Sequence, residues 1–336
     1  MKKPFFTIII PVYNVEHYLR RCADSILNQT FTDFQAIFIN DGSTDKSGEI
    51  CEEIGNDPRT LIIHKQNGGA SSARNYALDK AIGLYVLFLD SDDYLDNKDA
   101  LQKIYNQIQT YSNDVVIFGY KLLYINTNFR IEKRITDAKK LNDIQDKSSV
   151  LLNLFKNGNF PGSAWMMCVN SDIIENNHLR FPLGVTGEDI IWINKVLINS
   201  QSVGCIEDSF YIYLNNRPGQ ITSRHTLNGC NGMLMAIKDW LNIKDITELP
   251  AVSFQMAHVY LVLLMFYSDL CKNEREAIIE DVKNSAKILK AGTFKDNLIF
   301  LLIKLFNPYI IGLLIRNIYK FVQNLLKIKY NATSKK

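Results

Sequence analysis

Three carboxylates stand within four positions of one another directly after an apolar run, and they are well suited to hold a charged ligand. The run covers residues 84–89, and Asp90, Ser91, Asp92 and Asp93 follow it. Such a run predicts a strand buried on both faces, and ligands bind at the carboxyl ends of strands in open α/β sheets. Grouping ionised carboxylates there costs free energy unless a cation neutralises them. Carboxylate oxygens are hard ligands, which suit Mg²⁺ or Mn²⁺. The spacing predicts a divalent cation that carries a diphosphate, with helix capping by Asp92 or Asp93 as the alternative.

Three further polar segments follow predicted strands in the N-terminal half. The first contains Pro11 and Tyr13, the second Asp41, and the third leads to Arg74. Because parallel strands present their carboxyl ends at one edge of a sheet, we expect an aromatic ring, an acceptor, a guanidinium and the acidic cluster in one crevice. A nucleoside diphosphate needs these groups. The alternatives are loop packing for Tyr13, a turn for Asp41 and a surface ion pair for Arg74.

A second acidic pair, Glu188 and Asp189, opens the helix expected over residues 190–198. The positive end of a helix favours the ionised form of both carboxylates. The pair therefore suits a catalytic base, and plain capping of the helix is the alternative.

The elements that position these groups alternate in type. The expected strands and helices of the first 90 residues cover 6–10, 15–27, 34–39, a helix ending near 54, then 61–63, 70–81 and a strand that leads into Asp90. This alternation predicts βαβ units, hence an α/β fold with a parallel sheet flanked by helices. Strands at 114–118 and 203–213, a polar hairpin or excursion over 121–135 and a helix over 150–155 are also expected. Helices dominate after residue 228, which places a soft boundary near residue 225.

Composition excludes several classes of protein. A formal net charge of +3 over 336 residues is too small to indicate nucleic-acid binding. The six cysteines form no CxxC pair, which argues against a zinc cluster or a disulfide framework and fits a reducing compartment. No cleavable signal pattern opens the sequence, so the expected location is cytoplasmic.

The motifs together resemble family 2 of the glycosyltransferases, the inverting enzymes of GT-A fold that build bacterial capsules, O-chains and related glycans. The resemblance covers about residues 5–220 and rests on Thr7-Ile-Ile-Ile-Pro-Val-Tyr-Asn14, Asn40-Asp-Gly-Ser-Thr-Asp45, Asn67-Gly-Gly with Ala73-Arg-Asn75, and Phe88-Leu-Asp-Ser-Asp-Asp93. It implies a Rossmann-like, mostly parallel sheet in a catalytic domain over residues 1–225, followed by a helical region over 226–336.

The resemblance also implies roles for single residues. Asp189 is the expected base and Glu188 the second choice, and Asp92 is the expected ligand of Mn²⁺ or Mg²⁺. The expected nucleotide-sugar contacts are Pro11, Tyr13 and Asp41 at the uridine, Arg74 near the base and diphosphate, and Asp90 at the ribose or a metal-bound water. Ser91 is a further expected nucleotide-sugar contact.

Four weaker assignments follow from the same resemblance. Arg217 and Arg224 are expected at the diphosphate, and His225 is a further metal ligand. Trp165 is expected in the acceptor floor, with a core tryptophan as an equal alternative.

The C-terminal region from residue 295 to 336 combines apolar segments at 298–303 and 309–315 with eight Lys/Arg and one acid. Lys304, Asn307 and Pro308 interrupt the apolar residues, so neither segment reaches the ~20 residues of a membrane span. The composition predicts a peripheral contact with the inner face of the membrane. A helical cap or a homo-oligomer interface is the alternative.

The expected activity is metal-dependent, inverting transfer of a hexose or N-acetylhexosamine. The donor is a UDP-sugar, and the acceptor is a hydroxyl of a glycan, linked to polyprenyl diphosphate, in bacterial cell-surface polysaccharide synthesis. Two alternatives stay open, a nucleotidyltransferase that makes a sugar nucleotide and a non-catalytic scaffold or sensor of the same fold.

Overall fold

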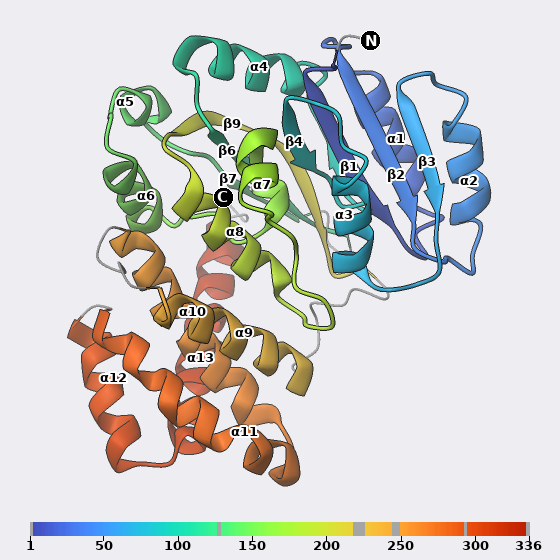
Figure 1. Cartoon of the computed structure of the whole chain (residues 1–336). Helices are drawn as coiled ribbons and strands as arrows, with labels where there is room; N and C mark the ends of the chain where they lie inside the picture. Colours follow the sequence, from blue (N-terminus) through green and yellow to red (C-terminus); the bar gives the residue numbers. More distant parts are fainter. Residues whose placement is uncertain (1–2, 126–128, 218–225, 244–248, 292–293, 334–336) are drawn as a thin grey trace. The chain divides into compact units, whose positions relative to one another are not determined.

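A computed structural model describes residues 3–125, 129–217, 226–243, 249–291 and 294–333 (Figure 1). The chain divides into two compact units. Unit 1 contains residues 1–184 and 188–221, and unit 2 contains residues 185–187 and 222–336. The functional division near residue 225 into a catalytic domain and a helical region stays a prediction.

Four parallel strands form one half of the sheet of unit 1, as the sequence predicts. They are β1 (Phe6–Val12), β2 (Phe34–Asn40), β3 (Thr60–His64) and β4 (Tyr85–Phe88), in the order β3-β2-β1-β4. The central strand β1 pairs Ile8 with Ala36 on one side and Leu87 on the other. All four carboxyl ends therefore meet at one edge, where the polar loops begin.

The other half of the sheet is mixed. Beyond β4, the order continues β8-β6-β9-β5, with β7 paired to β6, which makes nine strands among the described residues. The pairs β4–β8, β8–β6, β6–β7 and β9–β5 are antiparallel, whereas β6 and β9 are parallel. The bounds are β5 (Tyr94–Leu95), β6 (Val115–Tyr124), β7 (Phe129–Lys133), β8 (Met167–Asn170) and β9 (Val203–Asn215). The hairpin expected over 121–135 is thus formed by β6 and β7, while β5 and β8 were not expected.

Helices cover both faces of the parallel strands. In Figure 1, α3 lies in front of the strands, α1 lies behind them, and α2 lies beside β3. The chain crosses the sheet in one direction from β1 to β3 and in the other from β3 to β4, so right-handed crossovers place α3 on the opposite face from α1 and α2. The bounds in unit 1 are α1 (Leu19–Leu27), α2 (Ser47–Ile54), α3 (Ala70–Leu78), α4 (Ala100–Tyr111), α5 (Ala138–Asn142), α6 (Lys147–Lys156), the 3₁₀ helix η1 (Ala164–Met166), α7 (Ser171–Asn176) and α8 (Glu188–Asn199).

The expected bounds of the first two elements are wrong by a few residues. Strand β1 continues through Pro11 to Val12, since proline lacks only its donor. Helix α1 begins at Leu19 instead of residue 15, because side chains satisfy the preceding backbone donors. Ser47 Oγ accepts from the Val15 N–H at 2.9 Å, and an Asp45 carboxylate oxygen accepts from the next N–H at 3.0 Å.

All the secondary structure described in unit 2 is helical. Its elements are α9 (Leu227–Leu241), α10 (Pro250–Asp269), α11 (Lys272–Ser285), the 3₁₀ helix η4 (Ala286–Ala291), α12 (Phe294–Leu305) and α13 (Pro308–Thr333). Helix α10 supplies the core through buried side chains such as Tyr260 and Leu263, and α13 packs against it. A Cβ at Gly312 of α13 would lie 2.1 Å from the Leu264 carbonyl oxygen, so a glycine is required at this contact.

Candidate active site

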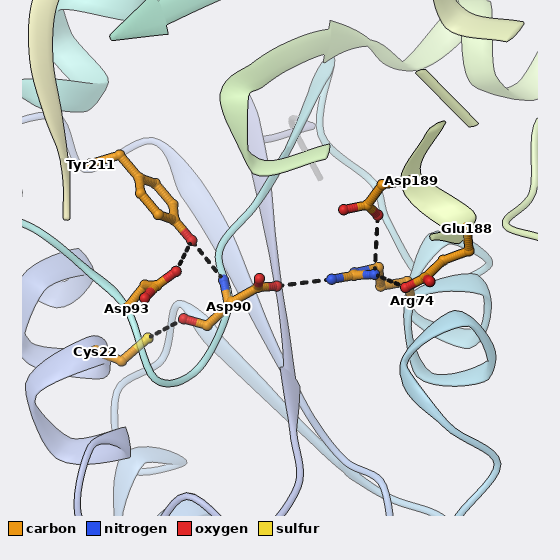
Figure 2. Close-up of polar contacts among 7 residues, drawn as sticks. All are labelled: Cys22, Arg74, Asp90, Asp93, Glu188, Asp189 and Tyr211. Atoms are coloured by element: carbon orange, nitrogen blue, oxygen red, sulfur yellow. Dashed lines mark hydrogen bonds and ion pairs between the residues drawn. The ribbon is translucent and has the colours of Figure 1, made fainter. Parts of the chain in front are cut away.

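Arg74 of α3 binds three carboxylates that come from two other parts of unit 1 (Figure 2). Its Nη1 donates to Glu188 Oε1 at 2.8 Å and to Asp189 Oδ1 at 3.3 Å, and its Nη2 donates to Asp90 Oδ1 at 2.9 Å. The Arg74 side chain is only 6% exposed, and its Nε has no hydrogen-bond partner among the described residues. One guanidinium therefore joins the end of β4 to the first turn of α8.

The segment before α8 is held to α3 by the residue next to Arg74. Asn75 donates to the Phe181 carbonyl oxygen and accepts from the Phe181 N–H, both at 2.8 Å. The Phe181 ring lies 5.3 Å from the Arg74 guanidinium and stacks on Trp192 of α8 at 4.9 Å. The Arg-Asn pair thus fixes both the position of α8 and the direction of its acidic pair.

The charges in this cluster do not balance, because three carboxylates surround the single guanidinium of Arg74. Burial raises the pKa of Asp189 to about 6; Arg74 opposes this rise, and Glu188 and Asp90 add to it. Burial lowers the pKa of Arg74, but Asp189, Asp90 and Glu188 outweigh burial and raise it above its ordinary value. A carboxylate whose pKa lies this close to neutrality is suited to accept a proton.

Asp92 lies next to this cluster and pairs with a different arginine. Its carboxylate accepts from Arg217 Nε, and its side chain is 14% exposed. Burial and the charge of Asp90 raise the pKa of Asp92, although Arg217 opposes the shift. The structure therefore brings Arg217 to the expected metal ligand, beside the expected diphosphate site.

The donor set fits a cation that is shared with a diphosphate. Among the described residues, no three His, Cys, Asp or Glu side chains are grouped to hold a metal alone. However, Mg²⁺ and its like are commonly held by one or two carboxylates together with substrate phosphates. Asp92, with Asp90 close enough to raise its pKa, provides that number. The surplus of negative charge at these buried acids is the feature that a cation would neutralise.

Asp93 has structural partners within the protein. It is fully buried and accepts from the Tyr211 hydroxyl at 2.7 Å and from the Leu214 N–H at 2.8 Å. The same hydroxyl accepts from the Asp90 N–H at 3.3 Å, so Tyr211 fixes two residues of the acidic loop (Figure 2). The alternative of helix capping is excluded for Asp92 and Asp93, because the N-cap of the next helix, α4, is Asp99.

Asp41 has partners within the protein as well as a place at the sheet edge. It is buried and accepts from the Gly68 and Gly69 N–H groups at 3.0 and 2.7 Å and from Lys65 Nζ. Gly42 beside it has φ +72°, and a Cβ there would lie 2.8 Å from the Asn67 nitrogen. The loops after β2 and β3 are thus tied together, and the expected contact of Asp41 with uridine stays a prediction.

The remaining expected contacts differ in exposure. Tyr13 is 47% exposed just after β1, and Pro11 is half-buried near the end of that strand, whereas Ser91 is buried. Trp165 is also buried, and its ring stacks on Tyr211 at 4.1 Å, which favours the alternative of a core tryptophan. Arg224 and His225 lie outside the described residues.

Sequence reasoning missed Lys65 and Tyr211, which support the site. Lys65 directly follows β3 as an ordinary polar loop residue. Tyr211 lies among apolar residues of β9, where its aromatic character predicts a strand and hides the role of its hydroxyl. No signal in the sequence pairs either residue with its aspartate.

An open α/β sheet with acidic loops at its parallel edge, joined through Arg74 to an acidic pair in the first turn of a helix, is typical of a GT-A-type glycosyltransferase domain. Residues 7–172 match the family described as Glycosyl transferase family 2, and the chain belongs to this family. The family resemblance and the GT-A fold predicted from the sequence are confirmed.

Known proteins support this assignment. The chain is 36% identical over 212 residues to glycosyltransferase GlyA of Streptococcus pneumoniae serotype 4, a match that covers 62% of this chain and 30% of GlyA. The chain spans less than two thirds of the length of the curated relatives it matches first.

Two solved structures share the fold. S. aureus TarS 1–349 in complex with UDP-GlcNAc is 18% identical with a TM-score of 0.70, over 94% of this chain and 91% of that one. The mannosyltransferase PcManGT from Pyrobaculum calidifontis, in complex with GDP-Man and Mn²⁺, is 15% identical with a TM-score of 0.55, over 92% and 83% of the two chains.

Proposed function

We propose that this chain is a metal-dependent, inverting glycosyltransferase. It moves a hexose or N-acetylhexosamine from a UDP-sugar to a hydroxyl of a glycan acceptor in bacterial cell-surface polysaccharide synthesis. The observation that carries the proposal is the cluster in which Arg74 holds Glu188 and Asp189 against Asp90 at the carboxyl edge of β4. This arrangement couples an acidic donor site to a proton acceptor within a family 2 domain.

The reaction needs one proton acceptor and a stabilised leaving group. Asp189 takes the proton of the acceptor hydroxyl, whose oxygen forms the new bond to the anomeric carbon while the bond to the diphosphate breaks and UDP leaves. Attack from the face opposite the leaving group inverts the configuration. A pKa of about 6 suits this role, since the carboxylate is then largely ionised at neutral pH and still basic enough to accept a proton.

Donor binding is assigned to the loops after the four parallel strands. Asp92 with Asp90 would hold Mn²⁺ or Mg²⁺, which supplies positive charge to the diphosphate when bound. Arg217 would contact the diphosphate, and Tyr13 with Asp41 the uridine. The complex of TarS with UDP-GlcNAc supports the choice of a UDP-sugar, and the Mn²⁺ in the PcManGT complex supports the choice of metal.

The partner and location follow from the C-terminal region. We assign the acceptor to a polyprenyl-diphosphate-linked oligosaccharide and the enzyme to the cytoplasmic face of the membrane as a peripheral protein. The basic and apolar composition of residues 295–336 supports this assignment.

Donor hydrolysis tests the proposal. The full chain is incubated with a panel of UDP-sugars and Mn²⁺ or Mg²⁺, and released UDP is measured. One donor is expected to give UDP, and EDTA or Asp92→Ala is expected to abolish the release. Asp189→Asn is expected to bind UDP normally while losing about 10²–10⁴-fold in transfer to an acceptor.

Two results would overturn the assignment. Pyrophosphate released from UTP and a sugar phosphate would indicate a nucleotidyltransferase. Binding of a UDP-sugar with no turnover under any metal and with any acceptor would indicate a scaffold or sensor.

A further inference from the structure

The exposed apolar side chains of unit 2 gather on its last two helices. In the described part of the chain, fourteen large hydrophobic side chains are exposed, and eight of them lie between residues 298 and 319. Six of these define what we term the α12–α13 apolar surface: Leu298, Leu301, Leu305, Ile310, Leu314 and Ile318.

The spacing places the six side chains on one face of each helix. On α12 they are three and four residues apart, and on α13 they are four residues apart, which is the spacing of a single helix face. The other face of each helix is packed inside unit 2, where Ile303 and Ile311 are buried and Gly312 meets the backbone of α10. Both helices are therefore held by one face and present apolar side chains to solvent with the other.

Positive charge is concentrated in the same segment. Residues 286–336 contain ten Lys/Arg and one acid, whereas the other 285 residues contain 28 Lys/Arg and 34 acids. Among the described side chains, Lys287, Lys290 and Lys320 are exposed near or on these helices. An otherwise acidic protein thus carries most of its exposed large hydrophobic side chains and its excess of Lys/Arg in the same segment.

We propose that the α12–α13 apolar surface docks on an anionic lipid bilayer, with the apolar side chains in the interface and the lysines at the headgroups. This combination of one apolar face and flanking cations is the composition of interfacial helices. A second copy of this chain is a poorer occupant, since the same basic segments would face each other. The proposal deepens the proposed function by naming which helices meet the membrane, but vesicle binding is measured without any sugar donor.

The contact is interfacial and not a span. Helix α12 has 12 residues, fewer than the ~20 that cross a bilayer. Helix α13 has 26 residues and is long enough, but over the described residues it is not apolar enough to span. One described helix, α10, is long and apolar enough to cross a membrane, and 61% of its apolar window is buried inside the protein. Burial assigns α10 to the core of unit 2 and leaves α12 and α13 as the exposed apolar helices.

Vesicle sedimentation of the full chain tests the proposal. The vesicles contain phosphatidylcholine with or without about a quarter of phosphatidylglycerol, a composition chosen to vary surface charge alone. The chain is expected to bind the anionic vesicles, and the double variant Leu301→Glu/Leu314→Glu is expected to bind at least ~tenfold more weakly. The matched control Ile82→Glu/Leu183→Glu, which changes two exposed apolar residues of unit 1, is expected to bind like the wild type.

A separate variant tests the contribution of the lysines to vesicle binding. Lys287→Gln/Lys320→Gln is expected to weaken binding to anionic vesicles roughly 20-fold and to leave binding to neutral vesicles unchanged. Circular dichroism and thermal unfolding confirm that each variant is folded.

Wild-type chain that stays in the supernatant with anionic vesicles, or equal sedimentation of the leucine variant, overturns the proposal. A dimer in vesicle-free solution that dissociates on Leu301→Glu/Leu314→Glu, without vesicle binding by the wild type, would instead assign this surface to a contact between two copies.

Discussion

At the scale of single residues, Arg74 decides how the acids of unit 1 behave. Its guanidinium is buried and donates hydrogen bonds to Asp90, Glu188 and Asp189. We therefore interpret Arg74 as a positioning residue for Asp189, the proposed catalytic base, and its contact with the donor stays a prediction. Two predictions follow from the charge that remains unbalanced.

Asp189→Asn is expected to stabilise the protein at alkaline pH. The pKa of Asp189 is raised from its usual 3.8 to about 6, so folding favours the protonated carboxyl. The stability that this gives is complete below pH 3.8 and is lost as pH rises through about 6. Asparagine carries no charge, so the free energy of unfolding should rise by about 1–3 kcal/mol at pH 8 and change little below pH 4. Urea unfolding at both pH values measures this, and an equal change at both would contradict it.

Replacing Arg74 is expected to move the pH profile. Because Arg74 opposes the rise in the pKa of Asp189, Arg74→Gln should shift the acidic limb of kcat/KM to higher pH. Arg74→Lys keeps the charge and should shift the limb less. A purely structural role would lower activity by the same factor at every pH in both variants, and that outcome would reject the assignment.

At the scale of elements, side-chain contacts hold the loops at the carboxyl edge. Tyr211 of β9 binds Asp93 and the Asp90 backbone, which fixes the loop after β4 to a strand on the other half of the sheet. Asp41 joins the loops after β2 and β3 in the same way. The site therefore depends on contacts between loops that are far apart in sequence.

Tyr211→Phe is expected to lower the free energy of unfolding by about 1–3 kcal/mol, because it leaves the buried Asp93 without its hydroxyl donor. Tyr105→Phe is the matched control, since no hydrogen bond of its hydroxyl is found in the described part of the chain. Denaturant unfolding of both variants measures the difference. Equal effects of the two substitutions would show that the Tyr211 hydroxyl contributes nothing.

Asp41→Ala is expected to act on both stability and donor binding. Loss of two backbone hydrogen bonds and the Lys65 ion pair should lower the free energy of unfolding, and UDP binding should weaken by roughly 1.5–3 kcal/mol. Calorimetric titration with UDP, performed where the variant is fully folded, separates the two effects. Unchanged UDP affinity would limit Asp41 to its structural contacts.

At the scale of the whole molecule, chemistry and membrane docking are assigned to different units. The acidic site lies in unit 1, whereas the α12–α13 apolar surface lies in unit 2. Because these assignments are separate, substitutions in one unit are expected to leave the activity of the other intact.

Leu301→Glu/Leu314→Glu is therefore expected to hydrolyse a UDP-sugar in solution at the wild-type rate. Transfer to an acceptor embedded in anionic vesicles should fall at least ~tenfold, as the protein no longer concentrates at the surface. Release of UDP and glycosylation of the embedded acceptor are measured in parallel. A loss of both activities would show that the two substitutions also disturb the active site in unit 1.

The sequence by itself determined the parallel half of the sheet and the position of the acidic loops. The apolar runs of β1, β2 and β4 and the residues Asp41, Asp90 and Asp92 that follow them are local signals, since each strand and its loop are continuous in the chain. The resemblance to family 2 required no more than these signals.

Only the tertiary structure decided which residues touch. It gave Arg74 three carboxylates as partners, paired Asp92 with Arg217, and made Asp93 part of the fold through Tyr211. It also showed that β4 continues into antiparallel pairing with β8. These contacts join residues 16 to 125 positions apart, and the pattern along the chain reports the burial of each segment but not the partner that packing brings to it.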